Sequence, residues 1–426
     1  MSNFATYENM KDSGIEWIGE IPAGWKVKKI KHSFSIIAGA TPKSEVPEFW
    51  DGDIAWITPA DYKTADVYVA GGKRNLSQAG YDSCGTTLIP SGSIVFSKRA
   101  PIGSVAINTN DLCTNQGCLS CVPRCECVTK YFYYMMSVFT EIFNLFGTGT
   151  TFKEISADNF ANFSLPFPEI IEQHQIVSYL DQKCTEIDAV IVKTKATIEE
   201  YKKLKQSIIT EAVTKGIRGD RPMKDSGIEW IGNIPTHWQV VPHKYVMHKE
   251  KTICEHYGGE DIISLTMNGV IVRDLSAGGK MPTTFDGYQY VEPEDLLLCL
   301  FDIDVTPRCV GIVRNYGVTS PAYSRFKVHE GYHNAYYDYL LRFIDDEKVF
   351  IHLSKNLRSS LTETDFGTIK TIVPPLYEQK EIADYLSKKC AEMDTLIARK
   401  TALLAEMEAY KKSVIYEYVT GKKEVQ

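Results

Sequence analysis

A ten-residue phrase, MKDSGIEWIG, occurs twice in this chain, beginning at Met10 and again at Met223. After one residue that differs, Glu20 or Asn233, each copy continues with Ile-Pro and then a tryptophan, Trp25 or Trp238, so both landmarks keep a spacing of 213 positions. A repeat of this length indicates that one structural unit is used twice. The fold therefore has to be interpreted as two related halves.

A second repeat lies downstream of the first. The stretch that begins at Pro168, PEIIEQHQIVSYLDQKC, matches PPLYEQKEIADYLSKKC, which begins at Pro374, at a spacing of 206 positions. The segment between the two landmarks shows little identity and is about seven residues shorter in the second copy. Each half thus has a constant opening, a variable middle and a constant end.

The constant end predicts a long helix in each half. A proline suits the first turn of a helix, where its missing N–H costs nothing, and no further proline occurs before Pro222 or after Pro375. Gly216 and Gly421 mark the predicted helix ends. Apolar or small residues recur at spacings of mostly three and four, which is typical of a coiled-coil seam. They are Ile187, Ile191, Thr194, Ile198, Tyr201, Ile208 and Ala212, and then Met393, Ile397, Leu404, Met407, Val414 and Tyr418.

Two apolar stripes need partners. Related repeats usually pair about a two-fold axis, so we predict that the two helices cover each other as an antiparallel coiled coil. The alternative is that each stripe packs on its own globular half.

The variable middles predict mixed α/β structure. Short runs rich in β-branched residues predict strands. These are Ser93–Ser97, Ser104–Ile107, Leu119–Val122, Leu296–Leu300, Val310–Val313 and Arg325–Val328, with short helices at Lys130–Phe146 and Tyr336–Phe343. Both middles follow a similar order of elements, which indicates one fold with two different surfaces.

Composition bounds the class of protein. The chain has 426 residues, 44% hydrophobic and 24% charged, which suits a globular protein of several domains. Its net charge is −7, so any nucleic-acid face must be a local basic cluster. No apolar run is long enough to span a membrane, and the first residues do not resemble a signal peptide. We expect a cytoplasmic protein with reduced cysteines.

Catalytic signatures are missing from the sequence. It contains no P-loop motif, no G-x-G-x-x-G and no NPPY-like or DPPY-like tetrapeptide of amino-methyltransferases. We therefore predict no catalytic residues and no bound metal. A zinc site stays open as an alternative at Cys118, Cys121, Cys125 and Cys127, because C-x-x-C is a common ligand pair. The simpler interpretation places these thiols in and beside a strand.

The repeated motifs resemble those of the specificity subunits of type I restriction-modification systems. The likeness rests on KDSGIEWIG-x-IP-x-x-W at both openings and on P-x-x-x-EQ-x-x-I-x-x-YL-x-x-K-C-x-E-x-D at both helix starts. It implies an α+β fold with two mixed α/β target recognition domains in a tandem pseudo-two-fold repeat, separated by two long helices in an antiparallel coiled coil. The expected segments are domain 1 at 1–167, a central helix at 168–217, domain 2 at 218–373 and a distal helix at 374–426.

The same resemblance implies a function. Such a subunit binds double-stranded DNA, reads an asymmetric bipartite target with one half-site per domain, and has no catalytic centre. It docks two modification subunits, which methylate adenine with S-adenosylmethionine, and restriction subunits, which use ATP and Mg. A scaffold whose coiled coil only bridges partner proteins is the alternative. The two divergent inserts argue against it, because a scaffold does not need them.

Candidate DNA contacts are basic or hydroxyl residues on loops, since these residue types bind phosphates and base edges. In the first half they are Lys73, Arg74, Lys98, Arg99, Thr148, Thr150 and Lys153. In the second half they are Arg308, Arg314, Arg325, Lys355 and Arg358.

Candidate contacts to the partner subunits lie in the constant part, because that surface does not change with the target. We predict Glu172, Gln173, Glu378 and Gln379 at the helix starts, with capping of the helix as an equally open role. The repeated tryptophans are expected to pack within the frame.

Overall fold

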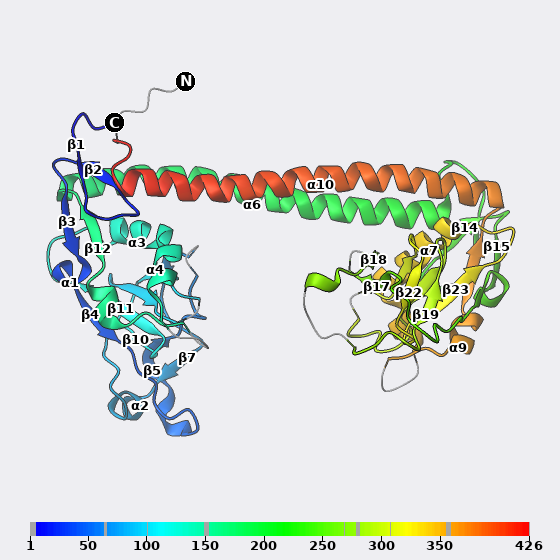
Figure 1. Ribbon diagram of the computed structural model, residues 1–426, viewed down its shortest axis with the longest axis horizontal. Coiled ribbons are helices and arrows are strands. Elements are labelled where there is room, and N and C mark those ends of the chain that lie inside the picture. Colours follow the sequence, from blue (N-terminus) through cyan, green and yellow to red (C-terminus); the bar gives the residue numbers. More distant parts are fainter. Residues whose placement is uncertain are drawn as a thin grey trace. The chain divides into compact units, whose positions relative to one another are not determined.

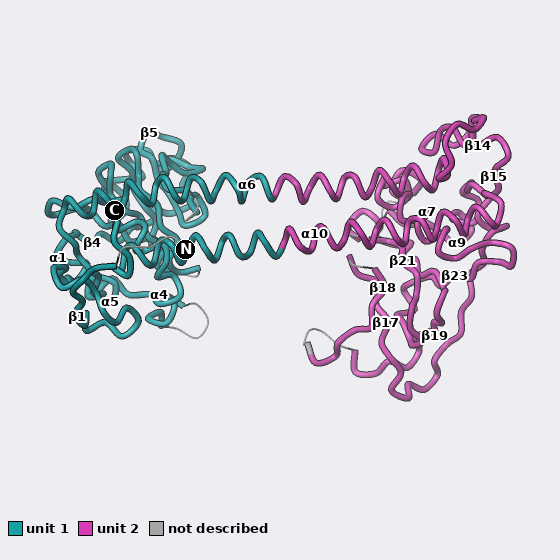
Figure 2. The backbone as a smooth tube through the Cα atoms, turned by 90° about the horizontal axis from the view of Figure 1, so that it is seen from above, with its two compact units in different colours: residues 1–194, 402–426 teal, residues 195–401 magenta. Residues whose placement is uncertain are grey.

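The computed structural model describes the chain except residues 1–5, 64–65, 100, 149–152, 268, 278–281, 307, 355–358 and 426. The chain forms two compact units, residues 1–194 with 402–426 and residues 195–401 (Figure 2). Each unit combines one globular part with a portion of both long helices, α6 (Ile170–Lys215) and α10 (Leu376–Val419). Among the described residues, no helix is both long enough and apolar enough to cross a membrane.

The repeated opening phrase folds into the same hairpin in both units. Strands β1 (Met10–Asp12) and β2 (Glu20–Pro22) pair antiparallel, as do β13 (Met223–Asp225) and β14 (Asn233–Pro235). In each hairpin the aspartate that ends the first strand accepts a hydrogen bond, 2.9 Å long, from the backbone N–H two residues on. Three isoleucines of each copy are buried in the core of their unit. The phrase is therefore a structural element of the frame.

The globular part of unit 1 is built on two small sheets. The larger sheet has the order β4 (Phe34–Ala38), β11 (Cys118–Pro123), β8 (Ile94–Ser97), β9 (Val105–Asn108), β6 (Tyr68–Val69). The smaller has the order β10 (Cys113–Thr114), β5 (Trp50–Ile57), β7 (Arg74–Leu76), and β3 (Lys26–Lys29) pairs with β12 (Ser164–Phe167). The helices are α1 (Ile30–Ser33), η1 (Pro47–Phe49), α2 (Gln78–Asp82), α3 (Thr129–Val138), α4 (Thr140–Phe146) and α5 (Ala157–Ala161).

Unit 2 repeats this plan. Its first sheet has the order β16 (Met247–Lys249), β23 (Ser324–Val328), β20 (Leu296–Leu298), β21 (Val310–Ile312), all antiparallel, which matches β4, β11, β8, β9. Its second sheet has the order β18 (Gly269–Val272), β17 (Ile262–Thr266), β22 (Gly317–Thr319), β19 (Gln289–Val291), and β15 (Gln239–Pro242) pairs with β24 (Lys370–Val373). The helices are η2 (His243–Tyr245), η3 (Leu275–Ala277), α7 (Asn334–Asp346), α8 (Val349–Leu353) and α9 (Glu363–Thr368).

The long helices run antiparallel within each unit (Figure 1, α6 green and α10 orange to red). In unit 1, Tyr179 stacks near Tyr418 with ring centroids 4.3 Å apart, and Asp188 pairs with Lys411 further along. In unit 2, Lys205 pairs with Asp394, and the end of α6 reaches the start of α10. Residue numbers rise along one helix as they fall along the other, so the predicted antiparallel coiled coil is confirmed.

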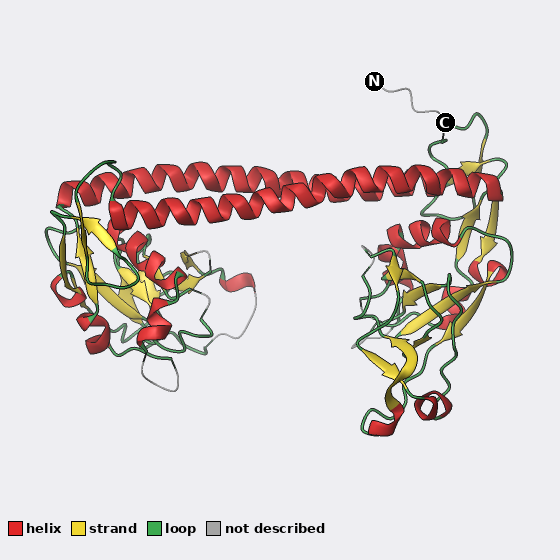
Figure 3. Ribbon diagram, turned by 180° about the vertical axis from the view of Figure 1, so that it is seen from behind, coloured by secondary structure: helices red, strands yellow, loops and turns green. Residues whose placement is uncertain are grey.

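The helices also pack on the globular parts, as the alternative interpretation required. The core of unit 1 joins Ile176 and Leu180 of α6 and Val414 of α10 to the side chains of α3 and the larger sheet. In Figure 3 the strands of each unit (yellow) gather on one side of its helix pair (red). The predicted fold class of mixed α/β domains with a helical coiled coil is confirmed.

Candidate nucleic-acid interface

Two predicted segments of unit 1 meet at one carboxylate. Lys98 follows β8, and its Nζ lies 2.7 Å from Glu154 Oε1, while Arg99 Nε lies 2.8 Å from Glu154 Oε2. Backbone bridges join Glu154 to Arg99 and to Thr148. Hydrogen bonds from Lys98 and Arg99 hold the pKa of Glu154 below its usual range, against an opposing effect of burial. The folded chain thus brings residues 98–99 and 153–154 together.

The side chains around this carboxylate remain accessible to a ligand. Arg99 exposes 47% of its side chain, and Lys153 and Thr148 are exposed. Lys98 exposes only 15%, so it serves mainly to hold Glu154. We name Lys98, Arg99 and Lys153 the basic cluster of unit 1. With Glu154 it carries two net positive charges, which suits a phosphate. Thr150 lies outside the described residues.

Lys73 and Arg74 form a separate exposed site at the start of β7. The guanidinium carbon of Arg74 lies 3.5 Å from the centroid of the Trp50 ring, and this stacking fixes the plane of the guanidinium. The backbone N–H of Lys73 donates to Asp61 Oδ1 at 3.2 Å, and its side chain is exposed. Both side chains are therefore held in place by the protein and remain accessible to a ligand.

Arg308 and Arg314 of unit 2 flank β21. Arg308 is half-buried and Arg314 is exposed. Burial raises the pKa of Asp338 on α7, and the charges of Arg342, Arg308 and Arg314 oppose this rise. The two arginines therefore lie close enough to α7 to interact with its carboxylate. Lys355 and Arg358 lie outside the described residues.

Arg325 corrects the prediction. It is 1% exposed, and its Nε lies 2.5 Å from Oδ2 of the buried Asp295. Its other nitrogens face Glu292 at 3.2 Å, Glu250 at 3.8 Å and the carbonyl of Tyr290 at 3.1 Å. A guanidinium enclosed by three carboxylates has no surface to offer a phosphate, so the prediction of a DNA contact is wrong for Arg325.

The repeated Glu-Gln pair also corrects a prediction. Glu172 accepts from Tyr7 at 2.5 Å and from Trp25 Nε1 at 2.9 Å. Gln173 is fully buried, accepting from the N–H of Val128 and donating to the carbonyl of Pro168, both at 2.9 Å. These polar groups are saturated inside unit 1.

The second copy of this pair repeats the arrangement. Glu378, 3% exposed, accepts from Arg221 at 2.8 Å, His237 at 2.6 Å and Trp238 Nε1 at 3.1 Å. Gln379 accepts from the N–H of His333 and donates to the carbonyl of Pro374, both at 2.8 Å. The partner-docking prediction is wrong for Gln173, Glu378 and Gln379, because their side chains fasten the helix start to the globular part. Glu172 is half-buried and has the same internal role.

The helices expose apolar side chains elsewhere. Val190 and Tyr410 in unit 1 are 45% and 52% exposed, and Leu204 and Leu396 in unit 2 are 46% and 36% exposed. Leu396 is the repeat equivalent of Val190, and Tyr410 that of Leu204, at the 206 spacing. Val190 and Leu396 come one position before the seam residues Ile191 and Ile397, and Leu204 and Tyr410 come one position before Lys205 and Lys411, which pair with the other helix. Within one unit the two therefore lie on the same side of the seam. We name Val190 and Tyr410 the apolar pair of unit 1, and Leu204 and Leu396 the apolar pair of unit 2. A search for outward residues common to both repeats could have found them.

The cysteine cluster does not converge on one point. Cys118 and Cys121 of β11 belong to different core clusters. Cys125 is exposed and Cys127 is half-buried. Among the residues that the structure describes, no three His, Cys, Asp or Glu side chains come together in a way that could hold a metal ion.

Comparison with known proteins identifies the relatives of this chain. Residues 22–200 match the family model of the type I restriction modification DNA specificity domain. The MjaIX specificity subunit of Methanocaldococcus jannaschii is 37% identical over 166 residues, which are 38% of each chain. The putative MjaX specificity subunit of the same organism is 24% identical over 98% of this chain and 97% of its own length.

Known structures contain the same fold. A solved chain from work on complex assembly and conformational transition of the type I R-M system covers 94% of this chain and 98% of its own length, with a TM-score of 0.70 and 14% identity. At that identity the likeness concerns the fold. The family model and the relatives confirm the resemblance that the repeated motifs indicated.

Proposed function

We propose that this chain is a type I restriction-modification specificity subunit, the sequence-specific DNA-reading subunit of such a complex. The observation that carries the proposal is one frame with two different inserts. The hairpin, the Glu-Gln pair and the sheet order recur in both units. The exposed residues beside those sheets differ. A constant frame with variable surfaces is what two separate recognition tasks require.

Each unit reads one half of a bipartite target. In unit 1 the accessible candidate cations are Arg99 and Lys153 of the basic cluster, together with Lys73 and Arg74, and in unit 2 they include Arg308 and Arg314. These sets share neither spacing nor residue order, so the two half-sites differ and the whole target is asymmetric. Two readers on one chain fix the distance between half-sites, in the way that the geometry of a dimer does.

The chain docks two copies of a modification subunit on its helices. The apolar pairs support this part of the proposal, because an interface core is formed by exposed apolar and aromatic side chains. They recur in both units, so the same partner surface can be used twice. In the assembled complex the modification subunits contribute S-adenosylmethionine and adenine methylation. Restriction subunits contribute the ATP- and Mg-dependent cleavage, and this chain contributes no catalytic residue.

Methylation mapping tests the proposal. The chain would be co-expressed with a cognate modification subunit, and methylated adenines would be mapped in host DNA. We expect one asymmetric motif of two short parts with a gap. A properly assembled complex that gives no motif, or a symmetric one, would contradict the proposal.

A domain exchange sharpens this test. Residues 27–165 would be replaced by the corresponding insert of a relative, with both hairpins and both helices kept. One half of the motif should change, and the other half and the gap should stay the same. A change in both halves would contradict the assignment of one half-site to each unit.

A further inference from the structure

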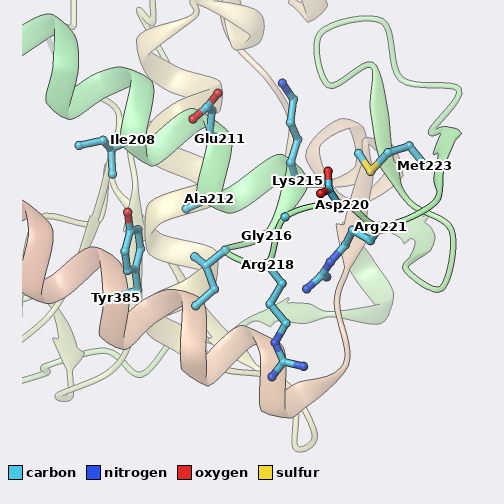
Figure 4. A pocket seen from close by; sticks show the side chains of 12 residues that line it. Ile208, Glu211, Ala212, Lys215, Gly216, Arg218, Asp220, Arg221, Met223 and Tyr385 are labelled. Carbon is cyan, nitrogen blue, oxygen red and sulfur yellow. The ribbon is translucent and has the colours of Figure 1, made fainter.

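The end of α6 lines an open cavity of about 480 Å³ in unit 2. Its apolar lining includes Ile208 and Ala212 of α6 and Tyr385 of α10. Lys215 and Arg218 stand at its rim. Figure 4 shows the Tyr385 ring rising from α10 toward Ile208 and Ala212. The volume falls within the range of binding pockets for small ligands.

The repeat explains why the cavity exists. Val213–Thr214 match Val419–Thr420 at the 206 spacing, so Ala212 of unit 2 is equivalent to Tyr418 of unit 1. By the same spacing Tyr385 is equivalent to Tyr179. In unit 1 the buried Tyr418 ring lies 4.3 Å from the Tyr179 ring, at an interplanar angle of 39°. Alanine in the equivalent position of unit 2 leaves Tyr385 without this ring.

We propose that the cavity of unit 2 binds an aromatic side chain, tyrosine or phenylalanine, presented by a protein partner of this chain. Unit 1 supplies the argument for this occupant, because its own frame places a tyrosine at the equivalent position against an equivalent tyrosine. Offset or tilted aromatic pairs at such distances contribute about 0.5–1.5 kcal/mol beyond the burial of area. Aromatic side chains in pockets are frequent anchors of protein interfaces.

The charged residues that line the cavity do not select a charged partner. Arg218 pairs with Glu381 and Arg221 with Glu378, so both guanidinium groups are already neutralised. Lys215 is exposed at the rim. Glu211 and Asp220 also line the cavity and are exposed, so they offset the charge of Lys215. The aromatic ring, and not a charge, is therefore what identifies the partner segment. Because Tyr418 fills the equivalent place in unit 1, the site takes one aromatic side chain per chain. This inference does not depend on the proposed DNA target.

The proposal can be tested with a small probe on the full chain. N-acetyl-L-tyrosine amide would be titrated and followed by saturation-transfer difference NMR, with N-acetyl-L-leucine amide as the non-aromatic control. We expect binding of the tyrosine probe at millimolar concentration and a weaker signal from the leucine probe. Ala212→Tyr supplies the missing ring and should abolish the signal, while thermal unfolding shows that the variant is folded.

Two further variants keep the test decisive. Tyr385→Leu removes the stacking partner without filling the cavity and should weaken binding of the probe. Tyr418→Ala opens the equivalent place in unit 1 and should add a second bound probe in soaked crystals. Absence of binding to the unaltered chain up to about 10 mM, a range in which a ligand of millimolar affinity binds, would overturn the proposal. Equal binding of both probes, or undiminished binding to both Ala212→Tyr and Tyr385→Leu, would also overturn it.

Discussion

The Nζ atom of Lys411 lies 2.6 Å from one carboxylate oxygen of Asp188 and 2.7 Å from the other. The same pair recurs in unit 2 between Lys205 and Asp394, at 2.6 and 2.7 Å. Asp394 is the repeat equivalent of Asp188, and Lys411 that of Lys205. Each ion pair therefore ties the two helices together at the same level of its unit and specifies their register.

Reversal of the charges in unit 1 tests this register. Asp188→Lys and Lys411→Asp should each lower the free energy of unfolding by about 0.2–1 kcal/mol, because the pair is partly exposed, and a like-charge pair replaces it. The double variant should recover most of the loss. Urea unfolding of all four proteins gives the coupling energy, and a coupling of zero would contradict the observed pairing.

Glu378 makes unit 2 sensitive to acid. Burial alone would raise its pKa, but hydrogen bonds from Arg221, His237 and Trp238 outweigh burial and lower the pKa to about 2. A carboxylate with a depressed pKa in the folded state stabilises the fold above its unfolded pKa of about 4.5. That stability, on the order of 3 kcal/mol, should disappear as the pH falls from about 4.5 to about 2.

Glu378→Gln provides the measurement for this pH dependence. The variant should be less stable at neutral pH, and its free energy of unfolding should change less between pH 4.5 and pH 2 than that of the unaltered protein. An identical pH profile in chemical denaturation would show that Glu378 does not carry the acid response.

The repeated parts of the fold could be predicted because the two copies can be recognised by comparing the sequence with itself. The seam residues of α6 recur at helical spacing, and Ile187, Ile191 and Ile198 are indeed buried. The strand β8 was expected from its run of β-branched and aromatic residues. By contrast, β6 is only two residues long, Tyr68–Val69, and pairs in parallel with the distant β9. Its place depends on tertiary packing, which local sequence does not encode.

In the candidate site too, the local sequence predicts some residues but not their partners. Lys98 and Arg99 could be selected as loop cations, but their shared partner Glu154 lies more than fifty positions away. The sequence around Arg325 suggests an exposed basic residue. Its buried partner, Asp295, lies thirty positions earlier, and no local pattern links the two. The Glu-Gln pair stands at the start of each long helix, and polar residues there are usually exposed. The side chains of Gln173 and Gln379 instead point inward and bond to the globular part. In each case a contact distant in sequence decides the role.

Arg325 should act on stability and leave the target sequence unchanged. Arg325→Met leaves Asp295 buried without its partner, and loss of one member of a buried ion pair costs about 3–5 kcal/mol. Adding Asp295→Asn should restore part of this loss. Thermal unfolding measures the stability, and methylation mapping at low temperature reads the target. A changed methylation motif with unchanged stability would show that Arg325 contacts DNA and would contradict this prediction.

His243 gives unit 2 a second pH response at higher pH. It is fully buried with its ring stacked on Phe366, and burial lowers its pKa from 6.5 to about 4, against smaller effects of the Ile369 and Phe366 backbone. The unfolded chain therefore takes up a proton more readily, so stability should fall as the pH decreases from about 6.5 to about 4. His243→Phe keeps the stacked ring and removes the titration. Its free energy of unfolding should be flatter in this interval, and a slope equal to that of the unaltered protein would refute the assignment.

Glu154 should restrain the basic cluster of unit 1. Its carboxylate neutralises part of the charge of Lys98 and Arg99, so Glu154→Gln should tighten binding of the assembled complex to any DNA. Arg99→Ala should weaken binding and reduce the slope of log affinity against log salt by about one if Arg99 contacts a phosphate. If Arg99 contacts a base, one position of the target should relax instead. Fluorescence anisotropy at several salt concentrations separates these outcomes. Unchanged affinity in both variants would show that the basic cluster does not contact DNA.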